Sequence, residues 1–446
     1  MQRRHFLGAA GAATASGLLG GVSLPGLAAG EDYKALVIVY LNGGSDGNNM
    51  LVPTDGAYTD YMNARANLAL SKASLTALSG SSAGHTFGLH PSLAPLASMY
   101  NAQRLGFIAN VGPLVKPATA AQVLAGTVPV PPFLLSHSDQ TAIVQGWQVS
   151  EDASGWAGRG LEGLDASLRT PLAAVTMDTN RTLVLGRQAP VSYMPAGGVQ
   201  YWGQANLEYP DSSAAQAMQR MSRWQFANDY EAEFARTFGG AFSDATRLTR
   251  AFLAARQPSQ DFGSDYLGNN LRALASVLPV FKSQGLRRQV VLTHWGGFDT
   301  HANQRGADPN TQDSQFTVLA KALKAFDDAN RASGLDQNVV TLVMTEFGRT
   351  LRPGSGGGSE HAWGNHWLAF GGPVAGGKVV GRFPQLVLGG VDDGDPGLNG
   401  RFVPTTSSDQ VGATLMQWMG LSSSKFSAVF PHLANFSSKT IALLRA

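Results

Sequence analysis

The sequence predicts an α/β protein built on a doubly wound, mostly parallel sheet with helices on both faces. Continuous apolar runs such as residues 35–41 are typical of strands that are buried on both sides. Segments of helical periodicity alternate with these runs, as a doubly wound sheet requires. Acidic residues or histidines follow several of the runs, and the carboxyl ends of strands are where open α/β sheets bind ligands.

Five runs are expected to form strands of the sheet. They cover residues 35–41, 105–111, 172–177, 289–293 and 339–345. The segments with helical patterns are 91–103, 214–237, 266–282, 314–332 and 409–419. We expect one domain over residues 30–446, in which the helical stretch of about 211–286 is an insertion or a cap on the sheet.

The first 29 residues have the pattern of a twin-arginine export signal. Arg3 and Arg4 stand shortly before Phe6 and Leu7, and an uncharged stretch rich in Ala, Gly and Leu ends in small residues. The twin-arginine translocase would export the folded mature chain, so we expect a periplasmic or secreted protein. No later segment offers about 18 uncharged apolar residues, so no transmembrane span is predicted for the mature chain.

The composition excludes several classes of function. The predicted signal contains two of the 33 basic residues and none of the 31 acidic ones, so the mature chain has 31 of each. This balance argues against a broad nucleic-acid surface. The chain has no cysteine, so disulfides, thiolate ligands and thiol nucleophiles are all excluded.

The most informative motif is the segment 294–301, in which two histidines and an aspartate follow an apolar strand. Asp299 and His301 are two residues apart, so an extended backbone would point both side chains the same way. An Asp and a His that leave a strand together are suitable metal ligands. His294 precedes the Gly-Gly turn and is not expected to share their site.

A second cluster contains Glu360, His361 and His366. The two histidines are five positions apart, a spacing that neither a strand nor a helix brings to one face. A loop is therefore needed for both to bind one ion; the alternative is a loop held by ordinary side-chain hydrogen bonds. The Gly-rich segment 353–359 fits a loop that closes over a site and a solvated linker equally well.

Three further segments carry candidate residues, each with a structural alternative. Glu346 follows a strand and could bind metal or act as a base, and Arg349 could hold an anionic oxygen, but the two could also form a buried ion pair. Asp46 lies in a turn of small polar residues, which offers oxygen ligands or a plain turn. Ser136 or Ser138 could be a nucleophile at a helix N-terminus, where an N-cap serine gives the same sequence.

Taken together, these segments resemble the bacterial DUF1501 family over essentially the whole mature chain. The matching segments are the twin-arginine start, 41–46, 136–137, 297–301, 345–349, 360–366 and, more weakly, 418–421. The family is similar to the alkaline phosphatase superfamily, which includes sulfatases. That resemblance implies a doubly wound sheet, a cage of Asp and His around divalent metal, and a Ser, Thr or modified Cys that attacks a phosphoryl or sulfuryl centre.

The resemblance also implies roles for individual residues. Asp46 matches the metal ligand that follows the first strand, and Ser136 matches the nucleophile. Asp299 and His301 resemble the Asp and His ligands of one metal, although their spacing is shorter than usual.

The chain departs from the superfamily pattern beyond these positions. Glu346 stands where the superfamily has an Asp, and Phe347 occupies the position of the expected His. His361 and His366 would then supply replacement ligands. The absence of cysteine excludes a formylglycine made from Cys.

Three functions are compatible with these residues. The first is an exported hydrolase of small anionic phosphate or sulfate esters, with Ser136 as the nucleophile, Arg349 holding the anion and a divalent ion (zinc, manganese or calcium). The expected metal ligands are Asp46, Asp299, His301, Glu346, His361 and His366. The second is a catalytically silent binding or assembly protein with an unknown exported partner. The third is a metallopeptidase or another hydrolase that uses a metal-bound water and needs no serine nucleophile.

Overall fold

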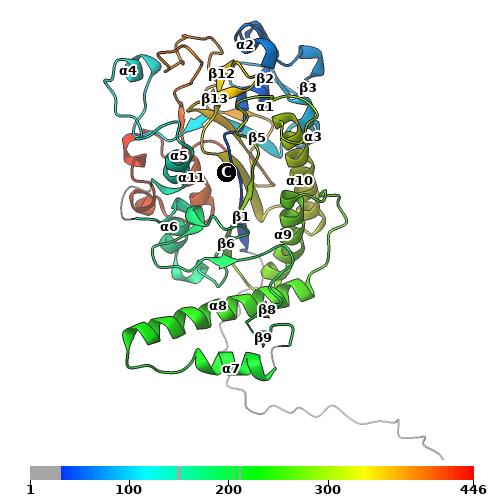
Figure 1. Cartoon of the computed structure of the whole chain (residues 1–446), viewed down its shortest axis with the longest axis vertical. Coiled ribbons are helices and arrows are strands. Elements are labelled where there is room, and N and C mark those ends of the chain that lie inside the picture. Colours follow the sequence, from blue (N-terminus) through cyan, green and yellow to red (C-terminus); the bar gives the residue numbers. More distant parts are fainter. Residues whose placement is uncertain (1–31, 148–151, 204, 210–211, 446) are drawn as a thin grey trace, which may run out of the picture.

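A central sheet separates two layers of helices (Figure 1). The computed structural model describes residues 32–147, 152–203, 205–209 and 212–445, so the predicted export signal lies outside the described residues. The sheet has nine strands and is mainly parallel. The predicted fold class is therefore confirmed.

The sheet strands are β1 (Lys34–Leu41), β5 (Leu105–Gly112), β6 (Ala174–Thr176), β7 (Ser192–Tyr193), β10 (Arg288–Trp295), β11 (Val339–Thr345), β14 (Asn365–Phe370), β15 (Val379–Val380) and β16 (Thr406–Ser407). Their order is β15-β5-β14-β11-β1-β10-β6-β7, and β16 pairs with β5. Only β14 runs antiparallel to its neighbours β11 and β5 among these described strands. The carboxyl ends of β1, β10 and β11 consequently lie side by side.

The apolar run of β1 fills both faces of the sheet. Ala35, Val37 and Val39 belong to one buried cluster, and the alternating residues Leu36 and Ile38 belong to the other. The first cluster is covered by α3 (Ala94–Asn101), α9 (Tyr266–Ser283) and α10 (Gln312–Ala332). The second is covered by α5 (His137–Gly146), α6 (Trp156–Gly163), α11 (Ser408–Trp418) and α12 (Phe426–Val429). Burial on both faces explains why the run is continuously apolar rather than alternating.

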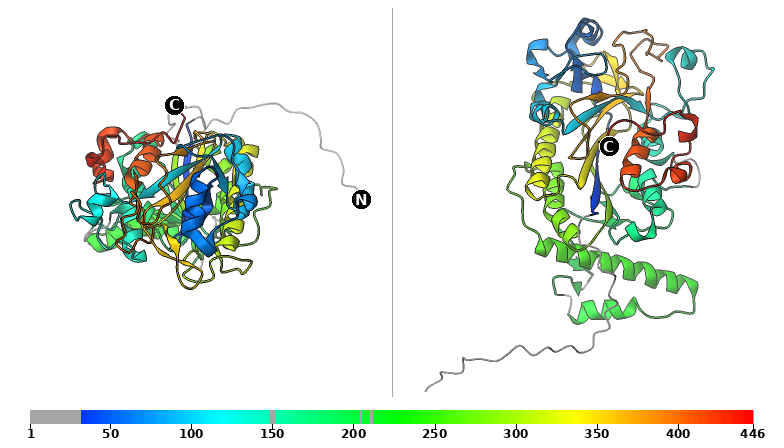
Figure 2. Two further views of the ribbon diagram at one scale, coloured as in Figure 1. Left: turned by 90° about the horizontal axis from the view of Figure 1, so that it is seen from above. Right: turned by 180° about the vertical axis from the view of Figure 1, so that it is seen from behind.

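Smaller elements surround the two ends of the sheet (Figure 2). Beyond the carboxyl ends lie α1 (Gly47–Met50), β2 (Leu51–Pro53), α2 (Ala57–Arg65), β3 (Thr76–Ala77), β4 (Phe87–Leu89), α4 (Ala120–Leu124) and the hairpin of β12 (Arg349–Pro353) and β13 (Ser359–His361). At the opposite end lie β8 (Tyr201–Trp202), β9 (Ala205–Asn206), α7 (Ser213–Met221) and α8 (Asp229–Ala254).

Among the described residues, the helical stretch of about 211–286 contains three helices rather than the two expected from the sequence. The helix expected over 214–237 is two helices, because Ser222 ends α7 and the Asn228 side chain accepts hydrogen bonds from the first amides of α8. α9, placed in the insertion from sequence, packs against β10 and α10 as part of a main helical layer. In the described part of the chain, no helix is both long enough and apolar enough to span a bilayer.

Candidate metal centre

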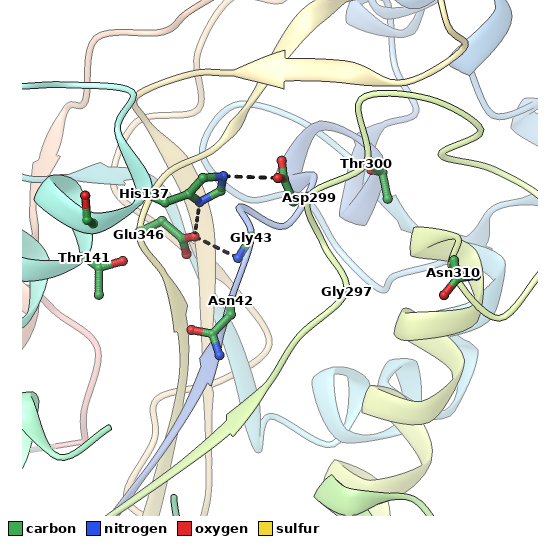
Figure 3. Close-up of a pocket in the computed structure, with 10 residues that line it drawn as sticks. Asn42, Gly43, His137, Thr141, Gly297, Asp299, Thr300, Asn310 and Glu346 are labelled. Atoms are coloured by element: carbon green, nitrogen blue, oxygen red, sulfur yellow. Dashed lines mark hydrogen bonds and ion pairs between the residues drawn. The ribbon is translucent and has the colours of Figure 1, made fainter. Parts of the chain in front are cut away.

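A cavity of about 590 Å³ opens at the carboxyl ends of β1, β10 and β11 (Figure 3). It is lined by Asn42, Gly43, His137, Ser138, Thr141, Gly297, Asp299, Thr300, Asn310 and Glu346. The three strands deliver loops to one edge of the sheet, and the first turn of α5 covers these loops from one side. This is the edge at which an open α/β sheet binds ligands.

Asp299 lies at the centre of a group of cationic and imidazole side chains. Its Oδ1 atom is 2.9 Å from Nε2 of His301, 3.3 Å from Nε2 of His361 and 2.7 Å from Nη2 of Arg349. Its Oδ2 atom is 3.4 Å from Nε2 of His137. The Asp299 side chain remains 49% exposed, so a ligand can reach it from the cavity.

Gly43 makes this arrangement sterically possible. Its φ of +109° lies in a region that L side chains rarely adopt, and a Cβ there would lie 2.5 Å from the amide nitrogen of Asp299. The loop after β1 therefore passes close to the loop after β10 only because this position has no side chain.

His301 and His361 face each other through their Nε2 atoms. Nδ1 of His361 lies 2.7 Å from the carbonyl oxygen of Leu135, and a carbonyl can only accept, so this nitrogen carries a proton. Nδ1 of His301 lies 2.6 Å from the Glu360 carboxylate. In the neutral rings both Nε2 atoms then present lone pairs, and they are only 3.0 Å apart. A proton or a cation is needed between them.

His137 has the same arrangement with a different acceptor. Its Nδ1 atom lies 2.9 Å from Oε1 of Glu346, and that oxygen also accepts from the amide of Gly43 at 2.7 Å. The other Glu346 oxygen accepts from the Thr345 hydroxyl at 2.8 Å. Nε2 of His137 is buried and forms no hydrogen bond among the described residues. An imidazole held from behind by a carboxylate, with its second nitrogen free, is the form in which proteins bind metals.

The local charges favour ligand forms at neutral pH for two of these residues. Burial opposes ionisation of Asp299, but the hydrogen bond and charge of Arg349 outweigh it and hold the pKa of Asp299 at about 2. Burial lowers the pKa of His361, which favours the neutral ring. The hydrogen bond to Glu346 raises the pKa of His137, so protons and metal compete for that side chain.

The donor set fits a transition-type divalent ion. Ligand atoms of His137, Asp299 and His361 all lie within 4.8 Å of one another. Nε2 of His301 adds a third imidazole beside Asp299. Three imidazoles and one carboxylate are ligands that zinc and related metals prefer, whereas calcium takes six to eight oxygens.

Asp46, predicted as a ligand, is not part of this group. It is fully buried at the start of α1, where it forms an ion pair with Arg65. Gln304 donates to the same Asp46 oxygen at 2.6 Å, and the amide of Asn48 donates to the other oxygen at 3.1 Å. The carboxylate is thus occupied by donors of the chain itself.

The two catalytic residues predicted from sequence also have structural partners. Ser136 is the N-cap of α5 and donates to Asp139 at 2.5 Å, and it does not line the cavity. Ser138 does line it and is exposed. Arg349 is fully buried, and its donors go to main-chain carbonyls and Asp299 rather than to the cavity.

The other two predicted ligands, His366 and Glu346, also have hydrogen-bond partners within the chain. His366 lies in β14, accepts from the amide of Asn110 at 3.1 Å and stacks on Phe383; burial lowers its pKa to about 3. Glu346 reaches the cavity but acts on His137 from behind. His294 is buried below the site, with its Nδ1 atom 3.5 Å from Asp178.

Sequence reasoning therefore found three of the four residues in the group, namely Asp299, His301 and His361, and missed His137. The sequence signal for His137 is its position between Ser136 and Ser138 at the start of a helix. Such a position exposes the side chain to the space beyond the sheet, but only the packing of α5 shows that this space is the cavity.

The fold and the site define an α/β protein with a candidate histidine–aspartate metal centre at the carboxyl edge of a mainly parallel sheet. More specifically, the chain belongs to the DUF1501 family, described as "Protein of unknown function (DUF1501)", whose model matches residues 33–395. The resemblance drawn from the sequence motifs is confirmed by this match. No curated protein sequence matches the chain.

Several solved structures are similar to this chain at low sequence identity and low TM-score. The lipoteichoic acid synthase LtaP from Listeria monocytogenes matches with 9% identity and a TM-score of 0.34, over 89% of this chain and 74% of that one. The phosphonate monoester hydrolase SpPMH from Silicibacter pomeroyi matches with 10% identity and a TM-score of 0.34, over 87% and 74%. The zinc complex of the C-terminal periplasmic domain of EcEptC from Escherichia coli matches with 8% identity and a TM-score of 0.30, over 77% and 74%.

Proposed function

We propose that this protein is a metal-dependent hydrolase of phosphate or sulfate esters, with one divalent ion held by His137, Asp299, His301 and His361. The observation that carries the proposal is the convergence of three imidazole Nε2 atoms on one carboxylate. Each imidazole is fixed by an acceptor behind it, which sets its tautomer and makes it a better ligand. The ester substrate and the exported location are taken from the sequence motifs.

The cavity offers suitable groups for an anionic ester. A bound divalent ion would supply the positive charge that stabilises the ester oxygens as the bond to the leaving group breaks. Ser138, unlike Ser136, lines the cavity, at the N-terminal turn of α5, where main-chain amides favour negative charge. Its hydroxyl lies 3.3 Å from that of Ser136 and 3.4 Å from the Asp139 carboxylate. Asn42 and Thr141 also line the cavity, and their side chains contain groups that can donate to substrate oxygens.

A second candidate function is binding without catalysis, and one contact favours it. Phe347 is buried, and its ring centroid lies 4.7 Å from that of His137 and 4.7 Å from that of His361. An apolar ring therefore stands beside the imidazoles, where a second ion would need another polar ligand. A single ion is compatible with hydrolysis and equally with a metal-supported binding site.

Metal binding is tested first on the purified full chain. After removal of metal by a chelator, zinc, manganese and calcium are each titrated, and the bound metal is counted by mass spectrometry. We expect one zinc or manganese ion per chain and weak calcium binding. His361→Ala should weaken binding by more than about 100-fold. His85→Ala is the matched control, because His85 pairs with Asp55 outside the cavity.

Hydrolysis is then measured on nitrophenyl phosphate monoesters, diesters and sulfates. Activity that requires metal and is lost in Ser138→Ala would support attack by the serine, and activity retained in that variant would assign attack to water. Metal binding without hydrolysis of any ester would favour the binding protein. Unchanged metal affinity in His361→Ala would contradict both functions.

A further inference from the structure

The helical hairpin of α7 and α8 contains a second, basic cavity far from the metal centre. It has a volume of about 420 Å³ and is lined by Ser222 and Arg223, next to the end of α7, and by Ser243, Arg247 and Arg250 of α8. Figures 1 and 2 both place α7 beside α8 at the end of the molecule away from β12 and β13. The cavity is therefore distinct from the proposed substrate site.

The spacing of these residues brings them to one side of α8. Ser243, Arg247 and Arg250 are separated by four and three positions, so they share one face of the helix. Gly239 lies on the same stripe, and a Cβ there would come within 2.8 Å of Cβ of Ser222. The end of α7 thus approaches α8 closely because of this glycine, and Arg223 is brought to the two arginines of α8.

The lining of this cavity carries positive charge only. No acidic residue lines it, and none of its three guanidinium groups forms an ion pair with a carboxylate in the described part of the chain. The charge of Arg247 opposes the burial that raises the pKa of Asp244, but that carboxylate accepts from the Ser192 hydroxyl at 2.6 Å and lines a different cavity. By contrast, Arg236 on the same helix pairs with Glu233. All three arginines of the cavity are exposed, so an anion can reach them from solvent.

We propose that this cavity, the arginine pocket, binds the phosphate or sulfate group of an anionic ligand. Guanidinium groups donate paired hydrogen bonds to tetrahedral oxyanions, and the Ser243 hydroxyl adds a further donor, whereas the Ser222 hydroxyl donates to the Gln219 carbonyl at 2.9 Å. Met221 and Trp224 flank Ser222 and Arg223 and are 49% and 58% exposed. These apolar neighbours suit a phosphate carried by a lipid headgroup as well as a free one, and both sources share the same chemistry at the pocket.

The test uses the full chain after metal removal, so that the metal centre does not contribute through a bound ion. Inorganic phosphate, pyrophosphate and sulfate are titrated by calorimetry. The double variant Arg247→Gln/Arg250→Gln should bind at least about tenfold more weakly, because each lost guanidinium removes charge-assisted hydrogen bonds. Arg236→Gln is the matched control and should bind as the native chain does. Ser243→Asp, which adds a carboxylate to the pocket, should abolish binding.

Vesicles separate the two sources. Association with phosphatidylcholine vesicles that contain phosphatidylglycerol, absent with phosphatidylcholine alone and lost in the double variant, would assign a headgroup phosphate. Phosphate or pyrophosphate binding without vesicle association would assign a free anion. The proposal is overturned if neither probe binds, or if the double variant and Ser243→Asp, both folded by circular dichroism, bind as tightly as the native chain.

Discussion

Asp46 and Asp299 follow two strands that pair side by side, β1 and β10, yet their surroundings differ. Each carboxylate is held by a fully buried arginine, Arg65 for Asp46 and Arg349 for Asp299. The other neighbours of Asp46 are an amide side chain and a main-chain amide, and its side chain is fully buried. Those of Asp299 are imidazole nitrogens, and its side chain is 49% exposed.

This difference separates a carboxylate that is saturated by donors of the chain from one that is open to a ligand. The amide donors around Asp46 cannot give up their protons, so they saturate its oxygens permanently. Imidazole Nε2 atoms can lose theirs, and they can then offer lone pairs to a cation that the carboxylate also reaches. The residue type after a strand therefore predicts little until the proton donors around it are known.

The largest expected effect distinguishes the two carboxylates by stability. Asp46→Asn leaves the buried Arg65 without a counter-charge. With its oxygen facing Arg65 and Gln304, the new side chain puts an amide nitrogen against the main-chain amide of Asn48. We expect a loss of about 3–5 kcal/mol in the free energy of unfolding, measured by urea denaturation. Asp299→Asn should lose less than about 1 kcal/mol, because the pair is partly exposed and Arg349 keeps its main-chain acceptors. Equal losses for the two variants would refute the distinction.

Much of the fold could be predicted, because burial on both faces leaves a direct trace in the sequence. The continuous apolar runs of β1, β10 and β11 identify these strands to within a residue or two at each end. β14 was missed, since its sequence begins with Asn365 and His366 and was read as part of a loop. Its polar start is explained only by tertiary contacts, in which Asn365 donates to the carbonyls of Ser45 and Phe347.

The site was predicted less completely, for a related reason. Asp299 and His301 are two residues apart in sequence, so their spacing predicts a shared site. Asp46 is predicted as a ligand from its turn, but its carboxylate pairs with Arg65 of α2, and nothing in the turn itself indicates this ion pair. His137 was missed because the packing of α5, not the local sequence, points its ring at Asp299.

A third carboxylate, that of Asp409, tests whether hydrogen-bond partners or burial decide if a buried aspartate is ionised in the folded protein. Asp409 is buried, as Asp46 is, but its Oδ1 atom accepts from the neutral Trp147 indole at 2.8 Å rather than from an arginine. Burial raises the pKa of Asp409 to about 6. The folded protein then holds this proton up to about pH 6 while the unfolded chain loses it near pH 4, so stability falls as pH rises between these values.

Asp409→Asn should remove this dependence on pH. The variant keeps an acceptor for Trp147 and carries no charge, so it should be more stable than the native chain by about 2–3 kcal/mol at pH 7 and similar to it at pH 4. Urea denaturation at several pH values measures the difference. A native chain whose stability is flat from pH 4 to 6 would show that Asp409 is ionised throughout, and that burial next to an indole does not keep it neutral.

The smallest expected effect concerns the acceptor behind a single imidazole. Glu360 lies 2.6 Å from Nδ1 of His301, and both side chains are partly exposed. Glu360→Gln keeps an acceptor oxygen but removes the negative charge that makes the ring a stronger ligand, so zinc affinity should fall about tenfold. The free energy of unfolding of the metal-free chain should change by less than about 0.5 kcal/mol, because the pair is exposed. Glu233→Gln, which breaks an exposed pair with Arg236 on α8, is the control for a general effect of charge. If Glu360→Gln and Glu233→Gln bind zinc equally well, His301 is not a ligand, and the ion rests on His137, Asp299 and His361 alone.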